Sequence, residues 1–187
     1  NLTKEILLNL INSHLNLKKY DHLLRIACNK KVLSISLRKR RKIVNNYSIR
    51  LRSYQRPLAS LKHLNYKKIL SFQKELSLNK EEIVFYKNNS LLEGSTTNII
   101  AVKKDILFIP LKSYYFGTTL RYLLDNTKMK IMKQNIKKND LKSYSELLLV
   151  GSGKEVISVS SIRNLAWRRT SFIAYKKLKN IYKKLLN

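Results

Sequence analysis

The sequence of 187 residues has few of the residues that cross-link or punctuate a chain: one cysteine, two prolines and four glycines. A single cysteine, Cys28, excludes an intrachain disulfide and indicates a reducing compartment. So few glycines and prolines, together with 44% hydrophobic residues, exclude a low-complexity chain and predict a globular domain. Cys28 ends the apolar run Leu23–Cys28, so we expect it to fill a core rather than to act as a nucleophile.

The chain also lacks the patterns of metal, membrane and exported proteins. Its histidines, His14, His22 and His63, are scattered without cysteine or carboxylate partners at ligand spacing, so we expect no metal site. No apolar stretch approaches the roughly 20 residues that span a bilayer, and no secretory signal pattern opens the sequence. We therefore expect a cytoplasmic protein with no membrane partner.

Acidic residues are scarce, since 39 lysines and arginines stand against 11 aspartates and glutamates, for a net charge of +28. A positive field of this size attracts phosphates, so a basic nucleic-acid-binding module is one alternative to an enzyme. The basic residues are nevertheless spread along the whole chain, and only Arg38–Lys42 forms a compact run. Nucleic-acid binders usually concentrate their charge on one face. We expect no nucleic-acid partner and interpret the run as a solvated linker.

The hydrophobic pattern predicts many short strands and a few helices. Helical periodicity runs from Thr3 to His14, over 65–76, from Gly117 to 124 and along the C-terminus, where Phe172, Tyr175, Leu178, Tyr182 and Leu185 share a stripe. Strand patterns occupy 23–28, 33–37, 43–54, 83–86, 98–102, 106–109, 129–132, 146–150 and 156–159. This mixture predicts an α+β or α/β barrel-like fold, divided near the basic run into residues 1–40 and 41–187.

Two segments contain candidates for carbonyl and heterocycle chemistry. Lys62, in Ser60-Leu61-Lys62-His63-Leu64-Asn65-Tyr66, stands among apolar residues, where desolvation would free its amine to attack a carbonyl. Glu93, followed by Gly94-Ser95-Thr96-Thr97-Asn98, could hold a pyridine nitrogen protonated. Taken alone, the first could be a solvated surface lysine and the second a hairpin turn with a surface glutamate.

Two further segments could bind phosphate. Gly117-Thr118-Thr119-Leu120-Arg121 opens a helix, whose free amides and dipole attract anions. Val150-Gly151-Ser152-Gly153-Lys154 is a turn of small residues between strands, with amides and a hydroxyl able to cradle a second side of the group. An ordinary helix N-terminus and a plain hairpin remain the alternatives.

Together, in this order, the four segments resemble the class IV aminotransferases, which include branched-chain aminotransferase, D-amino-acid aminotransferase and 4-amino-4-deoxychorismate lyase. The family pattern has Lys-x-x-Asn, then Glu-Gly-Ser-x-x-Asn, then Gly-Ile-Thr-Arg, and finally Glu-x-x-x-x-Gly-Thr. Here they read Lys62 to Asn65, Glu93 to Asn98, Gly117 to Arg121, and Glu146 through Gly151-Ser152. The resemblance extends from about Leu23 to the C-terminus, and it rests on the conjunction of the four segments, since no single motif is specific.

The resemblance implies a D-amino-acid aminotransferase-like fold, pyridoxal 5'-phosphate as cofactor, a small amino-acid-like substrate and a homodimer. By it, Lys62 would hold the cofactor covalently and shuttle the proton at the substrate Cα, and Glu93 would pair with the pyridine nitrogen. Asn98 would fix the loop that carries Glu93, and Tyr66 would approach the ring oxygen. The phosphate would be bound by Thr118, Thr119 and Ser152.

The sequence departs from the family at several points. Ser152 replaces a threonine, Leu120 stands where the family has its arginine, and Ser158 where a proline is common. The resemblance also implies that residues 1–40 are the C-terminal part of a small domain whose opening segment, with a phosphate-binding arginine, is missing, while 41–187 form the large cofactor-binding domain. We therefore expect a fragment or a truncated gene product, and a decayed, purely structural subunit is a further alternative.

The wording Leu61-Lys62-His63-Leu64-Asn65 is closer to the lyases than to the branched-chain enzymes. The resemblance thus favours 4-amino-4-deoxychorismate lyase, which releases pyruvate and gives 4-aminobenzoate for folate biosynthesis. Branched-chain or D-amino-acid aminotransferase is the alternative, because both reactions begin with the same Cα proton.

Overall fold

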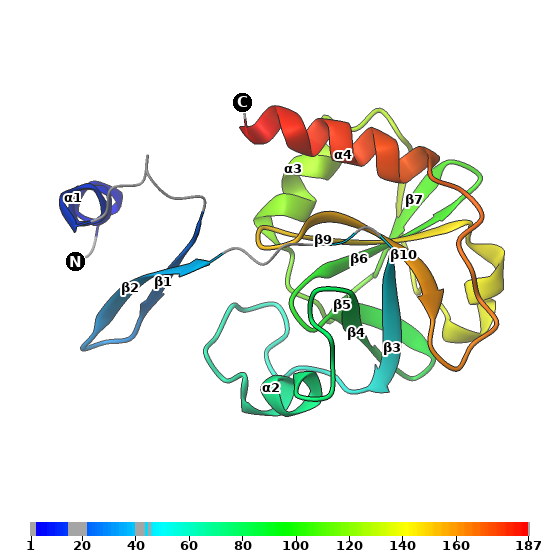
Figure 1. Cartoon of the computed structure of the whole chain (residues 1–187), viewed down its shortest axis with the longest axis horizontal. Coiled ribbons are helices and arrows are strands. Elements are labelled where there is room, and N and C mark those ends of the chain that lie inside the picture. The colour runs from blue at the N-terminus through cyan, green and yellow to red at the C-terminus, as the bar shows by residue number, and fades with distance from the viewer. Residues whose placement is uncertain (1–2, 15–21, 40–43, 45, 187) are drawn as a thin grey trace. The chain divides into compact units, whose positions relative to one another are not determined.

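The computed structural model describes residues 3–14, 22–39, 44 and 46–186 (Figure 1). The chain divides into two compact units, Asn1–Lys42 and Ile43–Asn187. Among the described residues, no helix is long and apolar enough to cross a membrane. The assignment of the first unit to a small domain and of the second to a cofactor-binding domain stays a prediction.

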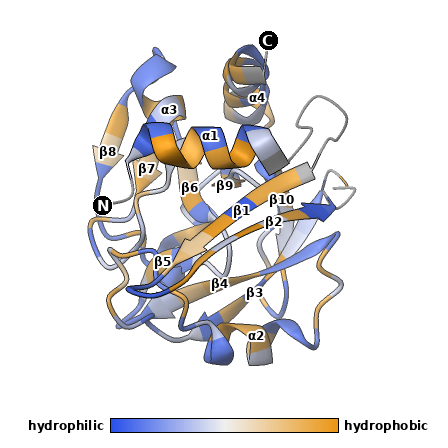
Figure 2. Ribbon diagram, turned by 90° about the vertical axis from the view of Figure 1, so that its left-hand side faces the viewer, coloured by the Kyte–Doolittle hydropathy of each residue, from blue (hydrophilic) through white to orange (hydrophobic). Residues whose placement is uncertain are grey.

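The first unit contains helix α1 (Lys4–His14) and a hairpin of β1 (His22–Cys28) and β2 (Leu33–Lys39), whose strands pair antiparallel. Hydrophobic residues run along both α1 and β1 (Figure 2). The expectation that Cys28 fills a core is wrong, because its side chain is exposed. Leu24 and Ile26 of the same strand are also 38% and 40% exposed. A two-stranded hairpin has no second layer of its own to cover such residues.

The second unit alternates strands and helices in the order β3 (Tyr47–Ser53), α2 (Lys67–Gln73), β4 (Glu81–Lys87), β5 (Ser90–Gly94), β6 (Asn98–Lys103), β7 (Ile106–Ile109), α3 (Thr118–Asn126), β8 (Ile131–Lys133), a 3-10 turn (Lys138–Ser143), β9 (Glu146–Gly151), β10 (Glu155–Ile162) and α4 (Ile173–Leu186). The predicted strands and helices are present, with ends shifted by a few residues. The sequence pattern predicts no strand over residues 90–94, but these residues form β5.

The strands form one sheet in the order β5-β4-β3-β10-β9-β6-β7-β8. β3 runs parallel to both β4 and β10, and β7 runs parallel to β8, whereas the other neighbours are antiparallel. The sheet curls until its two ends, β5 and β8, approach each other. The Leu91 N–H in β5 donates a hydrogen bond to Ile136 O, just after β8, at 2.9 Å. The predicted α+β, barrel-like fold is confirmed.

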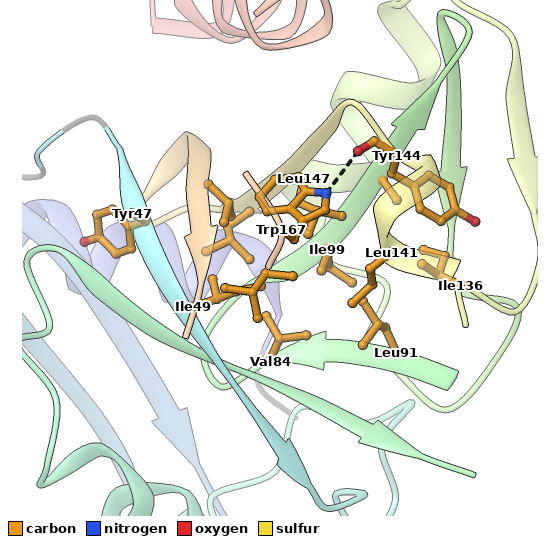
Figure 3. Close-up of a cluster of buried hydrophobic side chains, with 14 of the residues drawn as sticks. Tyr47, Ile49, Val84, Leu91, Ile99, Ile136, Leu141, Tyr144, Leu147 and Trp167 are labelled. Atoms are coloured by element: carbon orange, nitrogen blue, oxygen red, sulfur yellow. Dashed lines mark hydrogen bonds between the residues drawn. The ribbon is translucent and has the colours of Figure 1, made fainter. Parts of the chain in front are cut away.

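One face of the curled sheet encloses the main core (Figure 3). Alternate residues of the strands point into it, as the period of a strand requires. The Trp167 indole reaches in from the segment after β10 and donates a hydrogen bond to Tyr144 O at 3.0 Å. The buried strand residues of this core are Tyr47, Ile49, Val84, Leu91, Ile99, Ala101, Phe108, Leu147, Leu149, Ile157, Val159 and Ile162.

Helices cover the outer face of the sheet at two places. Helices α3 and α4 pack on β6, β7, β9 and β10, and α2 packs on β3 and β4 (Figure 1). Of the predicted stripe on the terminal helix, Leu178 and Tyr182 are buried, while Phe172 is 40% and Leu185 is 47% exposed. The α2 patch, built on Ile69, Ile83 and Phe85, borders the segment that contains Lys62.

Glu146, which opens the last family segment, caps α4. It is 1% exposed and accepts the amide N–H groups of Ala174 and Tyr175, each at 2.9 Å. The Ser171 hydroxyl also donates to it at 2.9 Å. A carboxylate at a helix N-terminus satisfies free amides and opposes the helix dipole. The role of Glu146 is therefore to anchor the terminal helix to β9.

Candidate active site

Glu93 is a buried carboxylate with a buried cationic partner. It lies in β5 opposite Phe85, on the α2 side of the sheet, and is 5% exposed. Arg56, itself 6% exposed, donates Nε to Oε1 and Nη2 to Oε2, both at 3.0 Å. The same Nη2 donates to Ala59 O at 2.9 Å. The surface-glutamate alternative is excluded, and Arg56 joins the segment before Lys62 to the Glu93 strand.

Tyr115 brings Lys62 and Glu93 into one neighbourhood. Its backbone N–H donates to Glu93 Oε2 at 3.1 Å. Its ring lies 5.9 Å from Lys62 Nζ, as a cation–π contact. Lys62 itself is exposed rather than enclosed by apolar neighbours as the sequence suggested. The two predicted residues, from different segments, thus meet the same aromatic residue.

The electrostatics of Glu93 combine burial with three favourable partners. Burial raises the pKa of its carboxyl, while the Tyr115 N–H, the Arg56 guanidinium and, more weakly, His63 lower it. The net direction is upward because desolvation is the largest contribution. A carboxylate offers about four acceptor positions. Arg56 and Tyr115 use three of them, which leaves one on Oε1 for a further N–H donor.

His63 orders the segment that contains Lys62. Its Nε2 lies 2.8 Å from Pro57 O, and its Nδ1 accepts the Asn65 N–H at 3.1 Å. The proton therefore belongs on Nε2, where it is donated to Pro57. The ring also faces that of Tyr66, with the centroids 6.1 Å apart. Tyr66 is partly buried in the α2 patch and its C=O accepts the Leu70 N–H at 2.8 Å.

Asn98 holds the segment before α3. Its Nδ2 donates to Tyr115 O, and its Oδ1 accepts the Gly117 N–H at 3.2 Å. A Cβ on Gly117 would lie 2.7 Å from that Oδ1, so this approach requires glycine. Among the residues that the structure describes, no side chain caps α3, which leaves the amides of its first turn available to an acceptor. Thr118 is exposed and Thr119 is 6% exposed at this end.

Ser152 is exposed in the turn between β9 and β10. That turn packs against the loop after Glu93, since a Cβ on Gly151 would lie 3.3 Å from Thr96 O. Thr97 Oγ1 in this loop is buried and has no hydrogen-bond partner among the described residues. Contacts thus connect Ser152 to the Glu93 loop, and Asn98 connects α3 to Tyr115.

Arg56, Tyr115 and the pair Glu82 and Lys154 are not among the site residues that the sequence predicts. Arg56 could have been suspected from its position six residues before Lys62 in a segment without acidic neighbours, but Tyr115 acts through its backbone, which leaves no signal. A cavity of about 290 Å³ lies elsewhere, beside α2 and β3, lined by residues such as Arg50, Arg52 and Arg163. None of the predicted site residues lines it.

The comparisons with solved structures show the same fold. A putative 4-amino-4-deoxychorismate lyase from Legionella pneumophila matches with a TM-score of 0.72 at 18% identity, covering 81% of this chain and 60% of that one. A putative branched-chain aminotransferase from Thermotoga maritima matches with a TM-score of 0.82 at 14% identity, covering 100% of this chain and 74% of that one. An aminotransferase from Brucella abortus, bound to pyridoxal phosphate, matches with a TM-score of 0.67 at 14% identity, covering 82% of this chain and 59% of that one.

This chain therefore spans about 60% of the length of the Legionella and Brucella proteins. No curated protein sequence matches it. The family comparison covers most of the chain: residues 9–162 match Amino-transferase class IV. These residues include Lys62, Glu93, Asn98, the start of α3 and Ser152. The chain belongs to the class IV aminotransferases, a pyridoxal-phosphate-dependent family.

Proposed function

We propose that this chain is the cofactor-binding part of a pyridoxal-phosphate enzyme in which Lys62 holds the cofactor, and that the enzyme is a 4-amino-4-deoxychorismate lyase. The observation that carries the proposal is the convergence of Lys62 and Glu93 on Tyr115. An amine for the cofactor aldehyde and a carboxylate for its ring nitrogen then lie in one neighbourhood. We further propose a cytoplasmic homodimer.

The described residues fit the chemical groups of the cofactor. Glu93 keeps one acceptor position on Oε1 for a ring N–H, and Arg56 supplies the cation that favours its ionised form. The uncapped first turn of α3, with Thr118 and Thr119, and the turn at Ser152 offer amides and hydroxyls to a phosphate dianion. Tyr66, beside His63, is the candidate for the ring oxygen.

When bound, pyridoxal phosphate supplies an electron sink for the carbanion formed at the substrate Cα. Lys62 Nζ, exposed over the face of Tyr115, would take the Cα proton as the neutral amine and return it as the ammonium. Glu93 would keep the ring nitrogen protonated, and Tyr115 and Arg56 hold that carboxylate in place. His63 restrains the Lys62 segment through Pro57 and Asn65.

The choice of lyase rests on the sequence Leu61-Lys62-His63-Leu64-Asn65, in which His63 hydrogen-bonds to Asn65 and to the preceding Pro57. The likeness of the chain's fold to that of a putative lyase from Legionella is consistent with this choice. Transamination, by a branched-chain or D-amino-acid aminotransferase, is the second candidate, supported by the likeness to the putative Thermotoga enzyme. Both reactions use the same proton transfer by Lys62.

The cofactor assignment is tested by reductive trapping. The chain is incubated with pyridoxal phosphate, reduced with borohydride, digested and mapped by mass spectrometry. We expect the pyridoxyl group on the peptide of Lys62, and its loss from that peptide in Lys62→Ala. Lys67→Ala, which removes an exposed lysine at the start of α2, is the matched control and should leave the labelling unchanged. Equal labelling of many lysines, unaffected by Lys62→Ala, would overturn the assignment.

The reaction is tested by giving the same preparation two substrates. Formation of 4-aminobenzoate and pyruvate from 4-amino-4-deoxychorismate supports the lyase. Amino transfer from a branched-chain or D-amino acid to 2-oxoglutarate, without 4-aminobenzoate, supports the transaminase instead. In either case Lys62→Ala should abolish turnover, whereas Lys67→Ala should retain it.

A further inference from the structure

Glu82 is a buried carboxylate that the proposed function does not use. It lies near the start of β4 and is 0% exposed. Lys154 Nζ donates to its Oε2 at 2.7 Å and the Thr96 hydroxyl does so at 3.0 Å, while the Ser95 hydroxyl donates to its Oε1. A buried charge is tolerated only when paired and hydrogen-bonded, so these partners account for its presence.

Glu82 contacts two segments of the proposed cofactor site directly and a third through Ser95. Ser95 and Thr96 follow Glu93 in the same loop. Lys154 ends the turn that contains Ser152, and its ammonium contacts the carboxylate although the two residues are 72 positions apart in the sequence. Gln73, the last residue of α2, donates to Ser95 Oγ at 2.6 Å, and α2 begins five residues after Lys62. The Glu82 carboxylate thus joins the Glu93 loop to the Ser152 turn directly, and joins α2 to them through the Ser95 hydroxyl.

We propose that Glu82 is a positioning residue that sets the spacing between the site's amine, its ring-nitrogen carboxylate and its phosphate turn. The proposal rests on the proposed function. Pyridoxal phosphate is a rigid planar molecule, so groups that bind its opposite ends must stand at a fixed separation. Binding sites lose affinity when their supporting contacts let such groups shift by about 1 Å. Lys154 carries the link to the phosphate turn.

The proposal predicts which ligand each variant affects. Lys154→Met keeps the approximate length of the side chain but removes the ion pair that joins the Ser152 turn to Glu82. Affinity for pyridoxal phosphate should therefore fall at least about tenfold. Affinity for pyridoxal, which has no phosphate, should change much less. Glu82→Gln loosens all three segments and should weaken both ligands. If both residues act through their contact, the double variant should be no worse than the poorer single variant, whereas independent effects would multiply.

A cofactor-free measurement separates positioning from direct phosphate binding by Lys154. Amide hydrogen exchange should accelerate in Lys154→Met at residues 95–97 as well as in the turn 151–154, because the ion pair joins them. The matched control is Lys179→Met, which removes the ion pair with Glu155 at the end of the same turn without touching Glu82. It should leave residues 95–97 protected. Exchange confined to the turn in Lys154→Met would overturn the proposal.

A milder variant keeps the test decisive if Glu82→Gln fails to fold. Thr96 is exposed and contributes one hydroxyl to Oε2, so Thr96→Val should fold and show a smaller change in the same direction. The two proposals fail separately. Absence of labelling at Lys62 in the unaltered chain refutes the proposed function. Normal labelling, with ligand preference and exchange unchanged in both Lys154→Met and Thr96→Val, refutes the positioning role alone.

Discussion

At the residue scale, Glu93 and Arg56 form a buried ion pair. Both side chains are buried, and two parallel hydrogen bonds join them at 3.0 Å. Such a pair contributes little net stability compared with apolar residues of the same shape, but removal of one member leaves a charge without a partner. The geometry therefore places Arg56 as the group that makes a buried carboxylate tolerable in β5.

The first prediction concerns Arg56→Gln, which should destabilise the fold by about 3–5 kcal/mol at neutral pH. Burial raises the pKa of Glu93. The contribution of this carboxyl to stability is therefore complete below the ordinary glutamate pKa of about 4.3, and it is lost as pH rises through the raised pKa of the folded state. Because Arg56 lowers the pKa of Glu93, its loss raises that pKa further and extends the decline in stability to higher pH. Urea unfolding between about pH 5 and pH 8 measures it.

Two controls accompany this measurement. Arg168→Gln removes an exposed arginine and should cost little at any pH. Glu93→Gln in the Arg56→Gln background removes the unpaired charge and should recover part of the stability at high pH. A loss in Arg56→Gln that is the same at every pH would mean that Glu93 does not titrate in this range.

The second prediction concerns the tight loop after Glu93. A Cβ on Gly94 would lie 2.1 Å from Thr97 Oγ1, a hydroxyl that has no hydrogen-bond partner among the described residues. Gly94→Ala should therefore destabilise the fold by about 1–3 kcal/mol. Thr97→Ala should be nearly neutral, because it deletes an unpaired buried hydroxyl. The double variant should recover at least about 0.5 kcal/mol relative to additivity in urea unfolding. Strict additivity would mean that the two residues do not clash.

At the scale of elements, Glu146 fixes where α4 begins, and the third prediction concerns it. Glu146→Ala frees the amides of Ala174 and Tyr175, which should cost about 0.5–2 kcal/mol, as for the loss of a helix cap. Glu146→Gln keeps an acceptor but loses the charge, so it should cost less, about 0.3–1 kcal/mol. Unfolding experiments give the order. Hydrogen exchange at residues 174–175 should accelerate in both variants.

Glu75→Ala is the matched control, because Glu75 is an exposed glutamate on the segment after α2. Its exchange pattern in α4 should equal that of the unaltered chain. If Glu146→Ala left residues 174–175 as protected as before, α4 would be held by its packing on Leu178 and Tyr182 alone.

Most elements could be predicted because their own residues contain the pattern. The runs 98–102 and 106–109 are apolar and β-branched, and both form strands as expected. β5 was missed because its one charged residue, Glu93, contradicts a buried strand until Arg56, 37 residues earlier, is known to neutralise it. Cys28 was misplaced because an apolar strand predicts burial without saying what covers it.

The candidate site divides in the same way. Lys62, Glu93 and Asn98 were found because each belongs to a motif of neighbouring residues. The contacts that hold them come from distant positions and from backbone atoms, as with the Tyr115 N–H on Glu93. Lys154 and Glu82, 72 residues apart, carry no local sign of their ion pair. Local sequence therefore identifies the reactive groups, and only the fold identifies their supports.

At the scale of the whole molecule, the net charge of +28 determines how the chain meets other molecules. Polyanions should bind weakly and without sequence preference, and that binding should fall steeply with added salt because counterions are released. Two copies of the chain, in contrast, repel each other. The proposed homodimer must overcome this repulsion. Added salt screens the repulsion, so it should favour the dimer while it weakens the binding of polyanions.

The fourth prediction follows from that contrast: self-association should strengthen with salt. Between about 0.1 M and 1 M salt the Debye length falls from about 10 Å to about 3 Å, so repulsion between two +28 chains is progressively screened. Sedimentation equilibrium should show a rising dimer fraction over this range, while retention of single-stranded DNA by the same protein falls. Association that weakens with salt would instead indicate an interface of opposite charges or bridging by a polyanion. A monomer at every ionic strength would refute the dimer, because the main force opposing it would by then have been screened.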